Sequence, residues 1–337
     1  MKRGISHDRA RTAAIVAALV IAGFAVIAAL HGPWTLRGLG WNRVAATLQE
    51  TGPLLLCGLA AAIAFRAGVL NIGGHGQYLL GAATFIALGT THRPAGPALM
   101  VLGIALLAAG AVGAAWALLA QALERWRGVP VVLSTILLNF VAVWLVAWLV
   151  EHPLRDPATT APQTALLADD LHLGLVLDGT RLHLGVVLAV LAVPLVWLVQ
   201  RRSALGFELD AVGLNPDAAA ANGIPVARRQ ALAMAVSGAL AAVAGGLQAA
   251  GVTWFMSNAS PSYGFAGVAV ALLGRLHPLG ITIAALFFAA LDTAARVAER
   301  RHGIPHDVAD VVKGVAVLVA LVVAAWALRR RTRTVAA

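Results

Sequence analysis

The sequence predicts an all-α polytopic membrane protein with about ten transmembrane helices. Hydrophobic residues make up 60% of the 337 residues and charged residues only 12%, and the mean hydropathy is +0.83. Soluble domains contain less apolar and about twice as much charged sequence. Seven apolar windows are each about long enough to cross ~30 Å of hydrocarbon as a helix; they cover residues 13–30, 98–120, 131–150, 183–199, 230–250, 278–295 and 308–328.

Three shorter windows complete the predicted set. Residues 52–65, 76–90 and 264–274 are apolar, but they are short or interrupted by glycine. The first long window follows a basic segment, as a signal peptide would. It has no clear cleavage site, however, and we assign it to the first transmembrane helix. The only cysteine, Cys57, lies in an apolar window, which excludes an internal disulfide. We therefore expect residues 1–337 to form a single transmembrane domain.

The net charge of +10 does not indicate a nucleic-acid partner, because the basic residues are scattered at the ends of apolar windows. Lys and Arg collect in the cytoplasmic loops of membrane proteins. With the N-terminus inside and ten crossings, 16 of the 25 Lys and Arg residues are cytoplasmic. They include the basic N-terminus, residues 1–12, and the basic tail, residues 329–337. We predict that both termini are cytoplasmic.

Two polar segments separate the apolar windows. Residues 151–182 are rich in Pro, Thr and Asp, and the predicted topology makes them an extracytoplasmic loop, since exposed backbone and ionised carboxylates are costly in hydrocarbon. Residues 200–229 form a cytoplasmic loop with an Arg pair at each end. In this loop Asn215 suits a helix N-cap, Pro216 the first helical position and Gly223 the stop. A short surface helix is predicted there, either as a contact for another protein or as a connecting turn.

The stretch from Leu70 to Gly81, LNIGGHGQYLLG, places glycines, two amides and an imidazole between apolar runs. Polar groups inside membrane spans are expensive, and they usually face a cavity or another helix. Amides can pair with sugar hydroxyls or base edges, and aromatic rings offer a stacking face. Ser134 and Thr135 have an alternative partner, the carbonyls of their own helix. The candidate solute-facing residues are Asn71, His75, Gln77, Asn139, Gln248, Trp254, Asn258 and Tyr263.

Four blocks in fixed order resemble a known family. They are LNIGGHGQYLLGA at 70–82, STILLNFVA at 134–142 followed by PLRDP and PQT, FELDAVGLNPDAAAANGIPVARRQALAMAVSGALAAVAGGLQAAG at 207–251, and GVAVALLGRLHPLG at 267–280. The sequence is similar to permease subunits of bacterial ABC importers for nucleosides and simple sugars, within the ribose and branched-chain amino-acid permease group. The resemblance runs from about residue 52 to 328.

The resemblance implies a multi-pass protein of the bacterial plasma membrane with several partners. These are a cytoplasmic ABC ATPase, a second and non-identical permease, and an extracytoplasmic solute-binding lipoprotein. The chain contains no GxxxxGK[ST] phosphate loop, so we expect no cofactor and no enzyme activity in this subunit, with ATP bound by the partner. In the family the loop at 213–224 carries a coupling helix that docks on the ATPase. The resemblance therefore assigns coupling to Gly213, Asn215, Pro216, Ala219, Gly223 and Ile224.

Two points stay open at the level of sequence. Arg228 and Arg229 can meet acidic residues of the ATPase, which adds Arg228 to the coupling set, or anionic lipid headgroups. Relatives of the nucleoside branch often carry acids where this chain has His75 and Ala266 and near Val131. Either the pathway is less acidic here, or those acids have structural roles elsewhere.

The sequence gives less support to other classes of protein. An ATP-independent carrier for a small polar solute needs an ion-coupling site, and the only acid found inside the predicted spans is Asp292, for which Arg296 four residues on is a partner. A membrane enzyme needs convergent catalytic groups, whereas the histidines are dispersed and no H-E-x-x-H motif occurs. A channel would have no use for a capped cytoplasmic helix.

Overall fold

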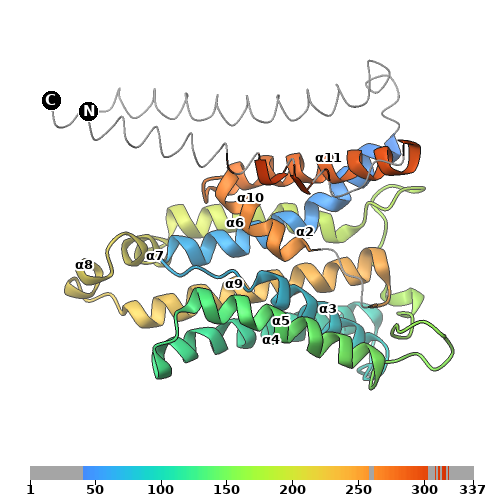
Figure 1. Cartoon of the computed structure of the whole chain (residues 1–337), viewed down its shortest axis with the longest axis horizontal. Coiled ribbons are helices and arrows are strands. Elements are labelled where there is room, and N and C mark those ends of the chain that lie inside the picture. Colours follow the sequence, from blue (N-terminus) through green and yellow to red (C-terminus); the bar gives the residue numbers. More distant parts are fainter. Residues whose placement is uncertain are drawn as a thin grey trace, which may run out of the picture.

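A computed structural model of the chain describes residues 41–257 and 262–302, together with positions 308, 310, 311, 313–315 and 318. The regular elements in this part are helices (Figure 1). They are α2 (Trp41–Arg66), α3 (Gly74–Gly89), α4 (Ala98–Arg127), α5 (Val131–Glu151), η1 (Asp169–Leu171), α6 (Leu184–Arg202), α7 (Ala204–Leu214), α8 (Pro216–Ala221), α9 (Val226–Gln248), η2 (Ala249–Thr253), α10 (Tyr263–Leu273) and α11 (Pro278–His302). Within the described residues, β-pairing is limited to isolated bridges.

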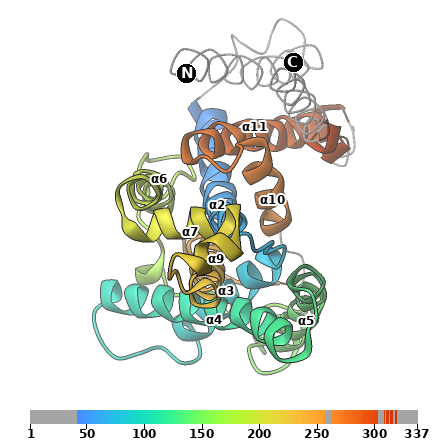
Figure 2. The same cartoon turned by 90° about the vertical axis from the view of Figure 1, so that its left-hand side faces the viewer.

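Helices α2 and α9 lie at the centre of the bundle, with α4, α5 and α6 outside them (Figure 2). Within the most apolar stretch of α2, 83% of the residues are buried, against 22% in α6. Hydrophobicity alone does not select the central helices, because lipid tails are as apolar as leucine. Small residues and polar groups determine which helices are central, and α9 contains many small residues.

Gly113 of α4 and Gly238 of α9 allow these two helices to touch along their backbones. A Cβ added to Gly238 would lie 2.2 Å from the carbonyl oxygen of Gly113, and one added to Gly113 would lie 2.3 Å from that of Gly238. Any side chain at either position would force the helices apart. The small-residue run of α9 therefore determines its close packing, as is common between helices in membranes.

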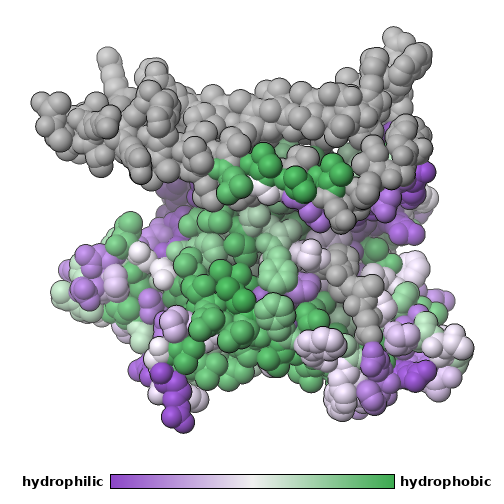
Figure 3. All heavy atoms as spheres, in the orientation of Figure 1, coloured by the Kyte–Doolittle hydropathy of each residue, from purple (hydrophilic) through white to green (hydrophobic). Residues whose placement is uncertain are grey.

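The outer surface agrees with a membrane-spanning bundle. In Figure 3 hydrophobic residues cover the middle of the visible face and hydrophilic residues gather at its two ends. One polar end carries α8, and the opposite end carries the loop of residues 152–183 (Figure 1). The protein is a multi-pass membrane protein.

Six helices of the described part are long and apolar enough to cross a membrane, namely α2, α4, α5, α6, α11 and α9 with its extension η2. The predicted windows 76–90 and 264–274 form α3, of 16 residues, and α10, of 11 residues. Window 13–30, most of window 308–328 and the terminal segments 1–12 and 329–337 lie outside the described residues. The predicted count of about ten crossings is thus not confirmed.

The long loop between α5 and α6 is fastened to the end of α9. The backbone N–H groups of Thr164, Leu167 and Leu173 donate to the carbonyls of Met256, Trp254 and Ala250, at 3.0, 2.7 and 3.0 Å. Two of these carbonyls, those of Trp254 and Met256, belong to the irregular chain after η2, which leaves them without helical partners. The loop and the residues after α9 therefore form one connected structure.

Candidate functional site

The structure contains the short surface helix that the sequence predicts. Helix α8 begins after Asn215, whose side-chain Oδ1 accepts the backbone N–H of Ala218 at 3.0 Å. Pro216 occupies the first turn, where its missing N–H costs no hydrogen bond. Gly223 follows the helix with a φ of +79°, which glycine adopts without strain.

Helix α7, which precedes α8, is joined to the end of α2. A Cβ added to Gly213 would lie 1.9 Å from the carbonyl oxygen of Arg66, so the two backbones are in direct contact. Arg66 Nε donates to Asp210 Oδ1 at 2.8 Å, and its Nη2 pairs with the second carboxylate oxygen. This bidentate geometry is the stronger form of an Arg–carboxylate contact. Gly213 and Asp210 together fix α7 on α2.

A second ion pair joins α7 to α9, between Arg229 and Glu208. The sequence offers an ATPase or lipid headgroups as partners of Arg229, whereas the structure gives this residue a partner in its own chain. Sequence reasoning missed Glu208 and Asp210, although acids in a loop bounded by Arg pairs were a usable signal. Arg228 is exposed, as are Asn215 and Pro216.

The surface of α7 and α8 that faces away from the bundle is partly apolar. The side chains of Phe207 and Leu214 are 70% and 87% exposed. Ala219 is buried, and the backbone N–H of Ile224 donates to its carbonyl at 3.0 Å. We name the exposed residues Phe207, Leu214, Asn215, Pro216 and Asp217 the α7–α8 surface. Apolar side chains at a polar end of a membrane protein are typical of a contact surface for another protein.

Three predicted pathway residues form a buried network around the start of α3. Asn71 Nδ2 donates to Gln77 Oε1 at 3.0 Å and to Ser237 Oγ of α9 at 2.9 Å. Asn139 of α5 donates to the Ile72 carbonyl at 2.9 Å and accepts the Gly76 N–H at 2.8 Å. Asn71, Gln77 and Asn139 are at most 2% exposed. Their amides hold the loop before α3 between α5 and α9.

Thr135 has the alternative role considered for it, since its hydroxyl donates to the Val132 carbonyl of its own helix at 3.0 Å. His75 is the second residue of α3, and its ring lies against that of Phe265 of α10, with centroids 4.7 Å apart and planes tilted by 30°. The His75 side chain is buried, and its Nδ1 has no hydrogen-bond partner among the described residues. His75 is thus a buried polar group at the contact between α3 and α10.

Glu50, an acid that the sequence analysis missed, is buried at the contact of α2, α10 and α11. The Tyr263 hydroxyl donates to Glu50, and Arg296 Nη2 lies 2.9 Å from Glu50 Oε1. The statement that Asp292 is the only acid in the spans is therefore wrong, because α2 starts at Trp41 and includes Glu50. Lys313 Nζ lies 2.5 Å from Asp292 Oδ1. The cluster of Glu50, Asp292, Arg296 and Lys313 thus contains two acidic and two basic side chains.

The remaining predicted residues lie in different contacts. Gln248 accepts a hydrogen bond from Gln49 of α2 at 3.5 Å. Trp254 has a φ of 60° and stacks on His172 of the long loop, with ring centroids 4.6 Å apart. Asn258 lies outside the described residues. The structure therefore brings Asn71, Gln77 and Asn139 together and places Trp254 with the loop.

A bundle of apolar helices with buried polar contacts and a capped helix at one polar end places the protein in the class of multi-pass α-helical membrane proteins. Residues 43–322 match the family described as the branched-chain amino acid transport system / permease component, which covers more than half of the chain. The chain belongs to this family, and it is the permease subunit of an ABC importer.

Individual relatives extend this result. The chain is 32% identical over 316 residues to the guanosine ABC transporter permease protein NupP of Bacillus subtilis (strain 168), covering 92% of this chain and 89% of the relative. It is 32% identical to the glucose ABC transporter permease protein TsgB13 of Haloferax volcanii, covering 90% and 84%. A metal-chelate type ABC transporter solved in an inward-facing conformation is 16% identical, with a TM-score of 0.45 and coverage of 86% and 85%.

Proposed function

We propose that this chain forms, with a second and non-identical permease, the pathway for import of a nucleoside, nucleobase or simple sugar. A binding lipoprotein outside the membrane delivers the solute, and cytoplasmic ATPase subunits drive its passage. The names of the relatives support this solute class, since they include permeases for guanosine, nucleosides and glucose. Two different guanosine permeases from the same Bacillus subtilis strain match the chain, which supports a non-identical partner.

The single observation that carries the proposal is the fixed position of the α7–α8 surface. A contact made there moves α2 with α7, because Gly213 touches the Arg66 carbonyl and Asp210 holds the Arg66 guanidinium. The surface itself offers exposed apolar side chains to a partner. In this proposal Gly213, Asn215, Pro216, Ala219, Gly223, Ile224 and Arg228 act in coupling to the ATPase. The α8 end and both termini are then cytoplasmic, and residues 151–182 are extracytoplasmic.

The pathway residues divide into two groups under this proposal. Asn71, Gln77 and Asn139 shape the pathway by holding the loop before α3, since their amides already bind protein atoms. His75 has a ring nitrogen without a partner among the described residues, and we propose that it meets the solute when α10 moves. Gln248, Trp254, Asn258 and Tyr263 remain candidates for the same role.

The test is uptake by the complete complex reconstituted in liposomes with its ATPase and lipoprotein. ATP-dependent uptake of labelled guanosine or glucose is expected, and it should stop when the ATPase is omitted. Replacing Phe207 and Leu214 by serine should reduce co-purification of the ATPase, while serine at Leu166, which is 63% exposed at the other end, should not. Uptake that persists without any ATPase would instead support an ATP-independent carrier or channel.

A further inference from the structure

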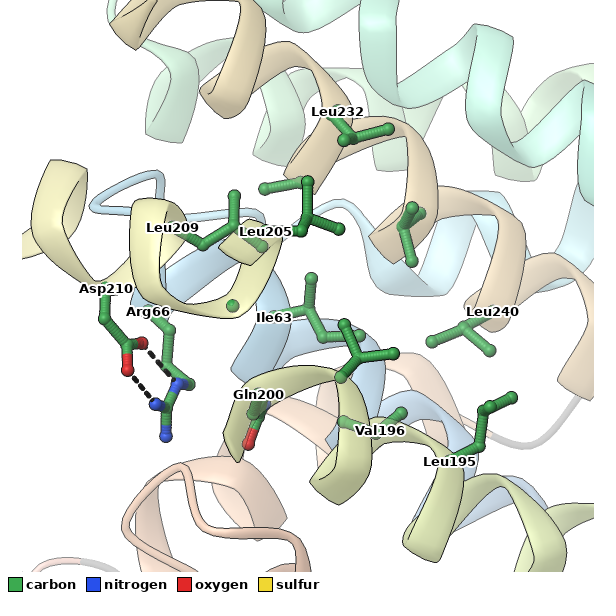
Figure 4. A pocket seen from close by; sticks show the side chains of 14 residues that line it. Ile63, Arg66, Leu195, Val196, Gln200, Leu205, Leu209, Asp210, Leu232 and Leu240 are labelled. Carbon is green, nitrogen blue, oxygen red and sulfur yellow. Dashed lines mark hydrogen bonds and ion pairs between the residues drawn. The ribbon is translucent and has the colours of Figure 1, made fainter. Parts of the chain in front are cut away.

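A groove lies between α2, α6, α7 and α9, close to the end of the bundle that carries α8 (Figure 4). Its volume is about 180 Å³. Leucine and valine side chains form most of its walls, and Gln200 and the Arg66–Asp210 ion pair lie at one end. Cavities of about 150 Å³ with aliphatic linings stay dry and accept apolar ligands. The lining therefore favours a hydrocarbon occupant over water.

The groove opens toward the outside of the bundle. Leu195 of α6 and Val236 of α9 line it and are 61% and 37% exposed. Only 22% of the most apolar stretch of α6 is buried, so the rest of the described chain leaves most of the surface of this helix uncovered. One turn of a helix with its side chains is about 10–12 Å wide and 5.4 Å long, which is roughly twice the volume of the groove or more. The slimmer first part of an acyl chain suits that volume.

Two positive charges lie in the last turn of α6, at the end of the bundle that carries α8. Arg201 and Arg202 end α6, are exposed, and form no ion pair among the described residues. Arg66 differs from them because Asp210 neutralises it. Arg202 lies seven residues after Leu195, so at 3.6 residues and 5.4 Å per turn it is on the same face of α6 and about 10 Å further along the helix axis. A headgroup at Arg202, with Arg201 in the same last turn, would place the first part of its acyl chain in the groove.

We propose that the groove binds one acyl chain of an anionic phospholipid, whose headgroup is held by Arg201 and Arg202. The binding itself does not depend on the proposed function. The consequence of lipid binding for transport does rest on the proposed function. The acyl chain fills the space behind Leu205 and Leu209 of α7 and so supports the joint between α7 and α2. Anionic lipid should then strengthen the coupling of ATP hydrolysis to uptake.

Native mass spectrometry of the full chain in detergent tests the site, with phosphatidylglycerol and phosphatidylcholine of identical acyl chains as probes. Two arginines near an anionic headgroup strengthen binding by about 30-fold, and we expect that preference for phosphatidylglycerol. The Arg201→Gln/Arg202→Gln variant should lose the preference. The matched control is Arg125→Gln/Arg127→Gln, which removes two exposed arginines from the end of α4 and should retain it.

Filling the groove should remove the bound lipid. Val236→Trp extends a large ring into the groove, whereas Val187→Trp adds the same ring at a 41% exposed position of α6 that does not line it. We expect loss of bound phosphatidylglycerol in the first variant only. If Val236→Trp does not fold, Leu195→Trp repeats the test at a more exposed wall position. Equal binding of the two lipids, or phosphatidylglycerol binding unchanged by both groove variants, would overturn the proposal, even if ATP-dependent uptake is intact.

Discussion

Replacing Gly213 by alanine adds one methyl group at the joint between α7 and α2. The new Cβ would lie 1.9 Å from the Arg66 carbonyl oxygen and 3.0 Å from the Gly68 nitrogen, whereas ordinary contact begins at 3.4 Å. The difference between 3.4 and 1.9 Å means that the two backbones must separate by about 1.5 Å. Neither backbone can avoid the contact by changing a rotamer, as a side chain would. Overpacking of this kind costs ~1–3 kcal/mol. The Arg66–Asp210 pair spans the same joint and should loosen with it.

The assay is solute uptake per ATP hydrolysed by the reconstituted complex, together with the melting temperature of the purified chain. We expect Gly213→Ala to lower both, while ATP hydrolysis continues. Gly103→Ala in α4 is the control, because an added Cβ there meets nothing within 4 Å and alanine favours helix over glycine by ~0.5–1 kcal/mol. If the two variants show the same uptake and the same melting temperature, the joint does not carry the coupling.

The remaining predictions concern three other contacts. Glu50→Gln should destabilise the chain in a denaturant titration by at most the ~3–5 kcal/mol of a broken buried pair, since the Arg296 side chain is 37% exposed. Adding Arg296→Gln should recover part of the lost free energy of unfolding. A strictly additive double variant would show that the pair is not coupled. Asn139→Ala leaves buried backbone groups unpaired at ~1–3 kcal/mol each, so hydrogen exchange of residues 72–76 should accelerate, and unchanged exchange would contradict the network. At the loop, a hydrogen bond from Arg93 lowers the pKa of Asp170 below its usual value, so this contact contributes above the ordinary Asp pKa and is lost as the pH falls through the lowered one. Relative to the intrinsic exchange rate at each pH, the protection of backbone amides in residues 168–173 should fall in that acidic range, and in Asp170→Asn it should no longer change with pH; a change in protection that persists in the variant would point to another group.

The capped helix α8 was predictable because its signals are local. Asn215, Pro216 and Gly223 act on backbone groups within a few residues of themselves, so their types and spacing determine the start and end of the helix. The Gly and Ala content of α9 is also visible in the sequence, but its packing partner Gly113 in α4 is not. The coupling role of α8 remains a proposal.

The start of α2 was not predictable from hydropathy. The first turns of α2 contain the polar residues Arg43, Gln49 and Glu50, so these turns do not belong to an apolar window. Glu50 is buried because Arg296 and Tyr263, more than 200 positions away, supply its partners. The contact of Asn71 with Ser237 was not predictable for a similar reason, because the two residues are 166 positions apart. Long-range pairing of polar groups leaves no local pattern in a single sequence.

Helix α9 has a consequence for how the two faces of the membrane communicate. With η2 it forms one 28-residue span from Val226 to Thr253, about 42 Å long. Its first residues follow α8, and the residues after it bond to the long loop. Suppose that a protein binds the loop more tightly in one position of α9. By thermodynamic reciprocity, it then changes the affinity of the α7–α8 surface for a partner by the same factor as that partner changes the affinity of the loop for the protein. The two affinities can therefore be measured from either side, and a mismatch between the two factors would reveal an input of energy.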